Sequence, residues 1–218
     1  MYYDGYTAMD VPDPQFGKLV GGRLCLDFVN TVCGRIPAGR QRDYAGRVVG
    51  ERLDSYGALL RWGGLTGALT AGQARALARE ASARPAKADA ALKESLALRE
   101  ALYSVFKAAV EGWPARPGDL VAVNRSLRQA RAHERLIGTA RFQWAWDDTP
   151  ALDRMLWPIA RSAGDLLAGP DLERVRQCPG EECGWLFLDT SRSRRRQWCD
   201  MAECGNLAKV RRFRQKRT

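Results

Sequence analysis

The chain has 218 residues, a length that accommodates one domain of ordinary size and a small additional module. Hydrophobic residues make up 45% and charged residues 28% of the sequence, as in water-soluble globular proteins. No window approaches the ~18 apolar residues of a membrane span, and the first ten residues lack the basic and apolar regions of a secretion signal. The composition therefore argues against membrane-spanning and secreted proteins and predicts a cytoplasmic protein with no membrane partner.

Positive charge is concentrated in the last part of the chain. The whole sequence carries a net charge of +10, and residues 174–218 contain twelve basic and five acidic residues, a local net charge of +7. This asymmetry favours a local surface that binds a polyanion over a uniformly basic protein.

A largely apolar run occupies residues 24–32. The spacing of Leu24 and Phe28 predicts a helix that begins near Leu24, with a strand as the alternative. Asp27 and Asn30 interrupt the run. They either bond to the backbone or to each other and fix a turn, because buried polar groups are normally satisfied, or they line a ligand pocket.

The segment that follows, residues 34–49, is rich in Gly and Arg and predicts a mobile loop. Cys25 and Cys33 lie eight residues apart with no second pair nearby. We therefore expect them to be buried thiols and not metal ligands.

Hydrophobic spacing and capping signals predict further helices. Thr70 and Gln73 have the capping-box pattern at the start of one helix, and Asp119 is the expected cap of another. The predicted helices lie near residues 56–62, 71–84, 86–110, 120–127 and 152–167. Together these elements predict a helical domain that spans residues 1–170.

The segment 142–146 alternates large aromatic residues with small or polar ones, a pattern that predicts a strand with one buried face. Four tryptophans either line a small-molecule pocket or belong to the core: Trp62, Trp144, Trp146 and Trp157. Three arginines predict a solvated helix face, with DNA contact as the alternative: Arg125, Arg128 and Arg131.

Four of the six cysteines lie in the C-terminal segment as two pairs, Cys178-x4-Cys183 and Cys199-x4-Cys204, separated by fifteen residues. Such pairs predict one tetrahedral Zn²⁺ site, because each pair forms a turn that can present both sulfurs to one ion. Two disulfides or simple packing are the alternatives, and a reducing cytosol disfavours the disulfides. Four cysteine ligands leave no open coordination position, so the predicted zinc, one per chain, is structural.

Residues 171–218 are fewer than the ~70–80 that a single apolar core usually needs. We therefore expect this segment to fold with its metal and to be poorly ordered without it. Its predicted fold is a zinc ribbon or treble clef that ends in a helix opened by Cys204. On that helix Leu207, Val210 and Phe213 form a stripe that is expected to face the zinc core.

Basic residues around the cysteines are the predicted contacts to double-stranded DNA. They are Arg192, Arg194, Arg195, Arg196, Lys209, Arg211, Arg212, Arg214, Lys216 and Arg217. A single small module buries only about 600–1,000 Å² on DNA, so useful specificity favours two copies on paired half-sites. We therefore predict a homodimer formed through the helical domain.

Two parts of the sequence resemble a known family. The CGN tripeptide at 204–206 and the AKVRRF run at 208–213 resemble the CGNR-type zinc finger of bacterial proteins, and residues 21–32 and 98–112 resemble parts of an ABATE domain. The resemblance implies a stress-induced transcription regulator in which the N-terminal domain senses a small-molecule effector and the finger binds DNA. Leu207 stands where the motif has its arginine, so the DNA contact of that arginine is not carried over.

The sequence thus predicts a mainly α protein, with a helical domain containing a short β element over residues 1–170 and a four-cysteine finger over 171–218. Three functions compete: a transcription regulator, a zinc-stabilised RNA-binding or protein-interaction module, and an enzyme. The enzyme is the weakest, because the sequence has no phosphate loop, nucleophile elbow or HExxH motif, and its one histidine, His133, is expected at the surface.

Overall fold

The computed structural model describes residues 13–36 and 46–216, and the part that it describes is mainly α, as predicted. Its helices are α1 Leu24–Val29, α2 Tyr56–Leu65, α3 Ala71–Ala83, α4 Pro85–Glu111, α5 Pro117–Ala132, α6 Leu156–Ala168 and α7 Asn206–Gln215. Three antiparallel hairpins are formed by β1 Val32–Ile36 with β2 Arg47–Glu51, β3 Glu134–Gly138 with β4 Phe142–Trp146, and β5 Val175–Gln177 with β6 Leu186–Leu188. None of the helices within these ranges is both long and apolar enough to cross a membrane.

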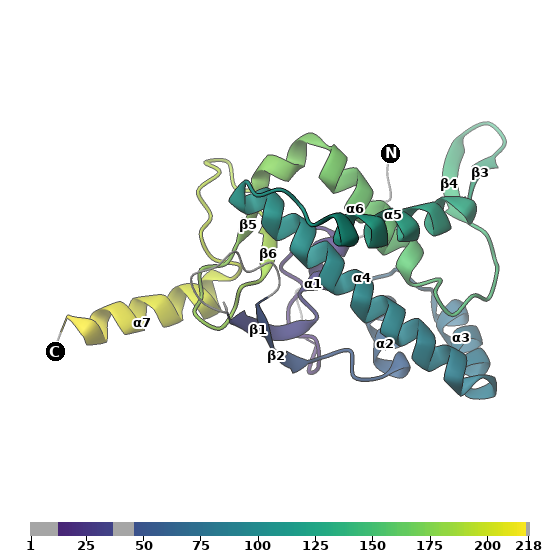
Figure 1. Ribbon diagram of the computed structural model, residues 1–218, viewed down its shortest axis with the longest axis horizontal. Coiled ribbons are helices and arrows are strands. Elements are labelled where there is room, and N and C mark those ends of the chain that lie inside the picture. Colours follow the sequence, from purple (N-terminus) through teal and green to yellow (C-terminus); the bar gives the residue numbers. More distant parts are fainter. Residues whose placement is uncertain (1–12, 37–45, 217–218) are drawn as a thin grey trace.

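Helix α4 is the longest element, and α1, α2, α5 and α6 lie against it (Figure 1). Its inward face carries the fully buried residues Leu102 and Phe106. Trp62 of α2 is also fully buried and lies 5.5 Å from Phe28 of α1, ring centre to ring centre. Trp62 therefore belongs to the core, one of the two positions considered for it.

Local capping explains where several helices begin. The predicted capping box is present, because Thr70 accepts a hydrogen bond from the Gln73 backbone and Gln73 accepts one in return. Asp119 was wrongly predicted as a cap: α5 begins earlier, at Pro117, whose fixed φ suits a first helical turn. Asp119 instead accepts hydrogen bonds from Ser104 and Arg116.

The predicted loop at residues 34–49 is wrong in its described parts, which form β1 and β2. Residues 37–45 lie outside the described residues. The glycine that suggested a loop, Gly34, lies where a Cβ atom would be 1.7 Å from the backbone oxygen of Glu182. A close backbone contact, not a turn, therefore requires glycine there. Cys33 on β1 is exposed, against the expectation of a buried thiol, whereas Cys25 is buried.

The strand predicted at 142–146 is β4, but its expected buried face is wrong. Phe142 and Trp144 are 66% and 50% exposed on a hairpin that projects from α5 and α6 (Figure 1). Only the base of the hairpin is packed, where the Trp146 ring lies 6.1 Å from the buried Trp157 of α6. The tryptophans thus occupy both core and surface positions.

Candidate metal centre and nucleic-acid interface

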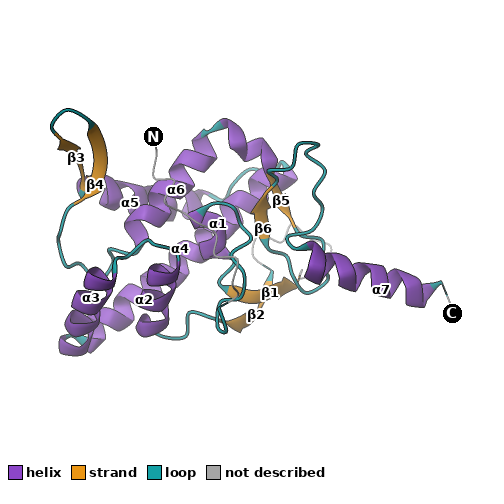
Figure 2. Ribbon diagram, turned by 180° about the vertical axis from the view of Figure 1, so that it is seen from behind, coloured by secondary structure: helices purple, strands orange, loops and turns teal. Residues whose placement is uncertain are grey.

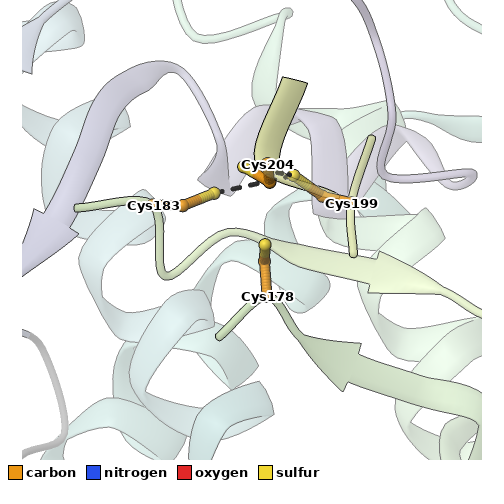
Figure 3. Close-up of side chains that lie close together, drawn as sticks. All are labelled: Cys178, Cys183, Cys199 and Cys204. Carbon is orange, nitrogen blue, oxygen red and sulfur yellow. Dashed lines mark hydrogen bonds between the residues drawn. The ribbon is translucent and has the colours of Figure 1, made fainter. Parts of the chain in front are cut away.

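The four predicted cysteine ligands converge on one point (Figure 3). Cys178 follows β5, Cys183 precedes β6, and Cys204 lies in the short π-helix Met201–Gly205 that leads into α7. All four Sγ atoms lie within 4.8 Å of one another, with Cys183 and Cys199 3.6 Å apart and Cys199 and Cys204 3.7 Å apart. All four are free thiols and form no disulfide.

This geometry fits a tetrahedral metal. Zn–S bonds of about 2.3 Å place two sulfurs of a tetrahedron about 3.8 Å apart, close to the separations observed. Cys178 and Cys199 are buried, and hydrogen bonding to Cys178 together with burial raises the pKa of the Cys183 and Cys199 thiols. A bound cation would offset this cost and favour the thiolate forms.

Each pair of cysteines lies on a turn that we call a knuckle: residues 178–183 form the first and residues 199–204 the second. Backbone hydrogen bonds hold both knuckles in place. The Cys178 N–H donates to the Trp185 carbonyl at 2.8 Å, and the Cys183 N–H donates to that of Gly180 at 3.0 Å. In the second knuckle, the Asp200 carboxylate accepts from the N–H groups of Ala202 and Glu203. The Lys18 ammonium lies 2.9 Å from the same carboxylate and ties this knuckle to the N-terminal part of the chain.

Asp27 and Asn30 both form hydrogen bonds to backbone groups. Asp27 accepts from the Gly21 N–H at 2.8 Å. Asn30 bonds to both backbone groups of Leu186, donating at 2.8 Å and accepting at 3.0 Å, as a neighbouring strand would. Both side chains are buried and satisfied in this way, and Asn30 acts as an anchor that holds β6 against α1.

A second anchor lies beneath the first knuckle and was not predicted. The Tyr103 hydroxyl of α4 donates to the Gly184 carbonyl at 2.9 Å and accepts from the Gln177 amide at 2.7 Å. The buried Arg35 guanidinium lies 3.9 Å from the Tyr103 ring centre and bonds to both carboxylate oxygens of Glu100 at 2.6 and 2.9 Å. The first knuckle therefore rests on a built polar layer.

The polar layer continues through Arg99, which binds both carboxylate oxygens of Glu51 at 2.6 and 2.7 Å. Burial by itself raises the pKa of Glu51 and Glu100, but the hydrogen bonds and charges of Arg99 and Arg35 outweigh it, so both pKa values lie below the ordinary range. A gap in the apolar stripe of residues 86–110, at Arg99, was the one sequence signal for this layer.

Helix α7 contradicts the expectation that its apolar stripe faces the zinc core. Leu207, Val210 and Phe213 are 58%, 46% and 61% exposed, and no residue of α7 is buried. The helix extends away from the body of the molecule (Figures 1 and 2). Its apolar stripe therefore lies in solvent alongside its basic residues.

The predicted DNA contacts fall into three groups. Arg196 stabilises the finger itself, because its guanidinium donates to the carbonyls of Trp198 and Cys199 and lies 4.7 Å from the Phe187 ring centre. Arg211 pairs with Glu181 at 2.8 Å, Arg214 makes a further interaction, and Arg217 lies outside the described residues. The remaining six are exposed and form no side-chain ion pair within the described ranges: Arg192, Arg194, Arg195, Lys209, Arg212 and Lys216.

His133 is half-buried and not simply a surface residue. Its ring stacks on Trp157, with ring centres 3.8 Å apart, and its Nδ1 lies 2.9 Å from an Asp147 carboxylate oxygen. Burial raises the pKa of Asp147, but hydrogen bonds from His133 and Thr149 prevail and lower it to about 2. The three residues fix the base of the β3–β4 hairpin.

Comparison with known proteins agrees with this arrangement. Residues 22–170 match the model of the ABATE family, described as "Putative stress-induced transcription regulator", and residues 174–217 match the CGNR zinc finger. A search of curated proteins finds no match for the chain. Both families are of regulator or zinc-finger type, and neither is a family of enzymes. The chain therefore belongs to the ABATE family and carries a CGNR zinc finger at its C-terminal end.

Proposed function

We propose that the protein is a cytoplasmic transcription regulator in which residues 171–218 bind double-stranded DNA and residues 1–170 carry the regulatory input. The observation that supports this most directly is α7, a basic helix that projects from the body with no buried residue. An isolated helix of ten residues is marginal in water, so such a helix suits a surface that is completed by a partner. A polyanion matches its charge.

We further propose that Cys178, Cys183, Cys199 and Cys204 bind one structural Zn²⁺ per chain. The sulfur separations and the absence of disulfides among the described cysteines support this assignment. Four thiolate ligands leave no position open for water or substrate, so the site serves folding and not catalysis. Elemental analysis of reduced protein is expected to find one zinc per chain.

The DNA contact is assigned to the six unpaired cations. Lys209 and Arg212 lie on α7 and Lys216 caps its C-terminal end, whereas Arg192, Arg194 and Arg195 lie on the loop before the second knuckle. A basic helix can place cations on phosphates or enter the major groove, where arginine reads guanine edges. Binding to phosphates makes affinity fall with salt, by about 0.9 in the logarithmic slope for each phosphate neutralised.

A charge-matched pair of variants tests the assignment. The triple substitution Lys209→Gln, Arg212→Gln, Lys216→Gln removes three positive charges from α7. Its control, Arg125→Gln, Arg128→Gln, Arg131→Gln, removes three exposed charges from α5. The α7 variant is expected to reduce the salt slope of duplex-DNA binding by about 0.9 for each phosphate that is no longer neutralised, and the α5 variant is expected to leave it unchanged.

Equal effects of the two variants would show that only net charge matters and would contradict a contact through α7. Competition with bulk RNA separates the regulator from the RNA-binding alternative, because a regulator retains particular duplex fragments in genome-wide occupancy. A small-molecule effector remains part of the proposal only as an inference from membership of a regulator family, whose description names no effector.

A further inference from the structure

The β3–β4 hairpin has an apolar face that stays exposed among the residues that the structure describes. Leu136 lies opposite Trp144 and Gly138 opposite Phe142, and cross-strand partners share a face of the hairpin. Leu136, Trp144 and Phe142 therefore lie together on one face, where they are 56%, 50% and 66% exposed. We call these three residues the hairpin face.

The base of this face is anchored, whereas its outer part is not. Glu134 forms an ion pair with Arg161, and the Trp146 ring packs near Trp157, so the hairpin is attached to α6 at its base. Beyond the base, the hairpin face belongs to none of the apolar clusters of the described residues. A two-stranded hairpin is marginally stable alone, so this one gains from a contact beyond its base. Contiguous exposed apolar surface also indicates an interaction site.

We propose that the hairpin face is where two copies of this chain meet, hairpin against hairpin, about a twofold axis. A self-complementary apolar face closes after two copies, whereas a contact with a different surface would propagate. The charges also fit. Arg141 lies in the turn at the tip of the hairpin, and Asp148 lies just beyond its base, where it is 3.3 Å from Arg135 but its side chain remains 87% exposed. An antiparallel pair brings the tip of each hairpin to the base of the other, so Arg141 of one copy lies near Asp148 of the other.

The area predicts a weak dimer. A fully exposed aromatic side chain offers about 150–250 Å², so three half-exposed residues leave roughly 300 Å² per copy and ~600 Å² in a symmetric pair. This lies below the roughly 1,000 Å² of a stable specific interface, so the contact is expected to be weak and concentration-dependent. The hairpin and α7 lie at opposite ends of the molecule (Figures 1 and 2), so dimerisation leaves both α7 helices available.

Sedimentation equilibrium of the zinc-loaded full chain, without DNA, tests the proposal independently of DNA binding. Concentration-dependent dimerisation is expected, with at least tenfold weaker association in the variant Phe142→Ser, Trp144→Ser. The control, Leu120→Ser, Val121→Ser, removes exposed apolar residues from α5 and is expected to dimerise normally. Circular dichroism establishes that both variants retain the fold.

A charge exchange gives a second test that does not depend on the apolar residues. Arg141→Glu and Asp148→Arg are each expected to weaken the dimer, and the two together are expected to restore it. A chain that remains monomeric at all concentrations overturns the proposal. So does a dimer that neither the serine variants nor the charge variants weaken, because another surface then holds it.

Discussion

The two halves of the zinc finger lie in opposite surroundings, although one cluster of cysteines joins them. In the first half, β5 and β6 are part of the main core, where Val175, Leu186 and Leu188 are at most 2% exposed. In the second half, α7 buries nothing, and Leu207 and Phe213 are about as exposed as any apolar residue of the described chain. The first half of the finger is therefore packed into the body of the molecule, whereas the second half projects from it.

This difference changes what the metal has to do. The first half is held by α1 and α4 through Asn30 and Tyr103, so it has a core without any ion. The second half buries no residue of α7 and is held by fewer contacts, among them the Lys18–Asp200 and Arg211–Glu181 ion pairs, the Arg196 hydrogen bonds and the cysteine cluster. We expect the metal to fasten the projecting half to the anchored half, in place of the sequence-based expectation that it orders all of residues 171–218.

Breaking the cluster is expected to give the largest effect and to separate the halves. With Cys199→Ser, Cys204→Ser, or after chelation, zinc is released, and structural zinc contributes about 10–16 kcal/mol in finger peptides. Hydrogen exchange is expected to show that protection disappears over residues 199–216 and is kept over 175–188, and DNA affinity is expected to fall by at least tenfold. Cys33→Ser, outside the cluster, is the control that keeps its zinc.

Loss of protection in both halves at once would show that the first half also depends on the metal. The helical domain would then not act as a scaffold for it, and the contrast between the two halves would disappear.

Removing the hydrogen bonds between Asn30 and Leu186 is expected to have the next largest effect. Asn30→Leu preserves approximate volume but leaves the buried N–H and carbonyl of Leu186 unpaired, at about 1–3 kcal/mol each. Urea denaturation is expected to show a loss of about 2–5 kcal/mol in the free energy of unfolding. Asn124→Leu on the exposed face of α5 is the control, with a change within ~0.5 kcal/mol. A loss as small as that in Asn30→Leu would contradict the anchoring role.

The same contrast explains what could be predicted from sequence. The cysteine cluster could be predicted, because ligand spacing is local and its chemistry is specific. The helices around α4 could be predicted, because their apolar spacing repeats along the chain. Asn30 could be assigned to a turn or a pocket, but its partner, Leu186, lies 156 residues away and no local pattern names it.

The errors share one physical cause. The stripe on α7 and the aromatic strand β4 both have the pattern of an element with one buried face, and that pattern states only that an apolar face exists. Whether the same chain covers the face depends on tertiary packing, and among the described residues both faces remain largely exposed. Gly34 is the converse error, because the sequence pattern predicts a loop there although it lies in a strand. The glycine is required by the close approach of the Glu182 backbone, which lies far along the chain.

Acid is expected to weaken the polar layer beneath the first knuckle by a smaller amount, separately from the metal release that protonation of the thiolates causes. Because the pKa values of Glu51 and Glu100 are lowered in the folded protein, their contribution is present above the unfolded value of about 4.3 and is lost as pH falls through the folded values. Glu51→Gln is expected to cost about 1 kcal/mol at neutral pH, discounted because Glu51 is one-third exposed. It should also flatten the decline in stability below pH ~4.3.

Denaturation followed at several pH values measures this effect. Glu111→Gln, at an exposed position at the end of α4, is the matched control. An unchanged pH profile in Glu51→Gln would show that the ion pair with Arg99 is not the source of the acid sensitivity.

The smallest effect is expected on α7 itself. Phe213→Ala removes an exposed ring and should change the free energy of unfolding by no more than ~0.5 kcal/mol, whereas Leu188→Ala in β6 opens a cavity in the core and should cost about 2–5 kcal/mol. Thermal or urea unfolding of the two variants measures the difference. A large loss in Phe213→Ala would mean that the stripe packs against a surface in solution, either in the same molecule or in a second copy. A near-zero loss leaves the stripe and the cations of α7 as one surface that only a partner completes.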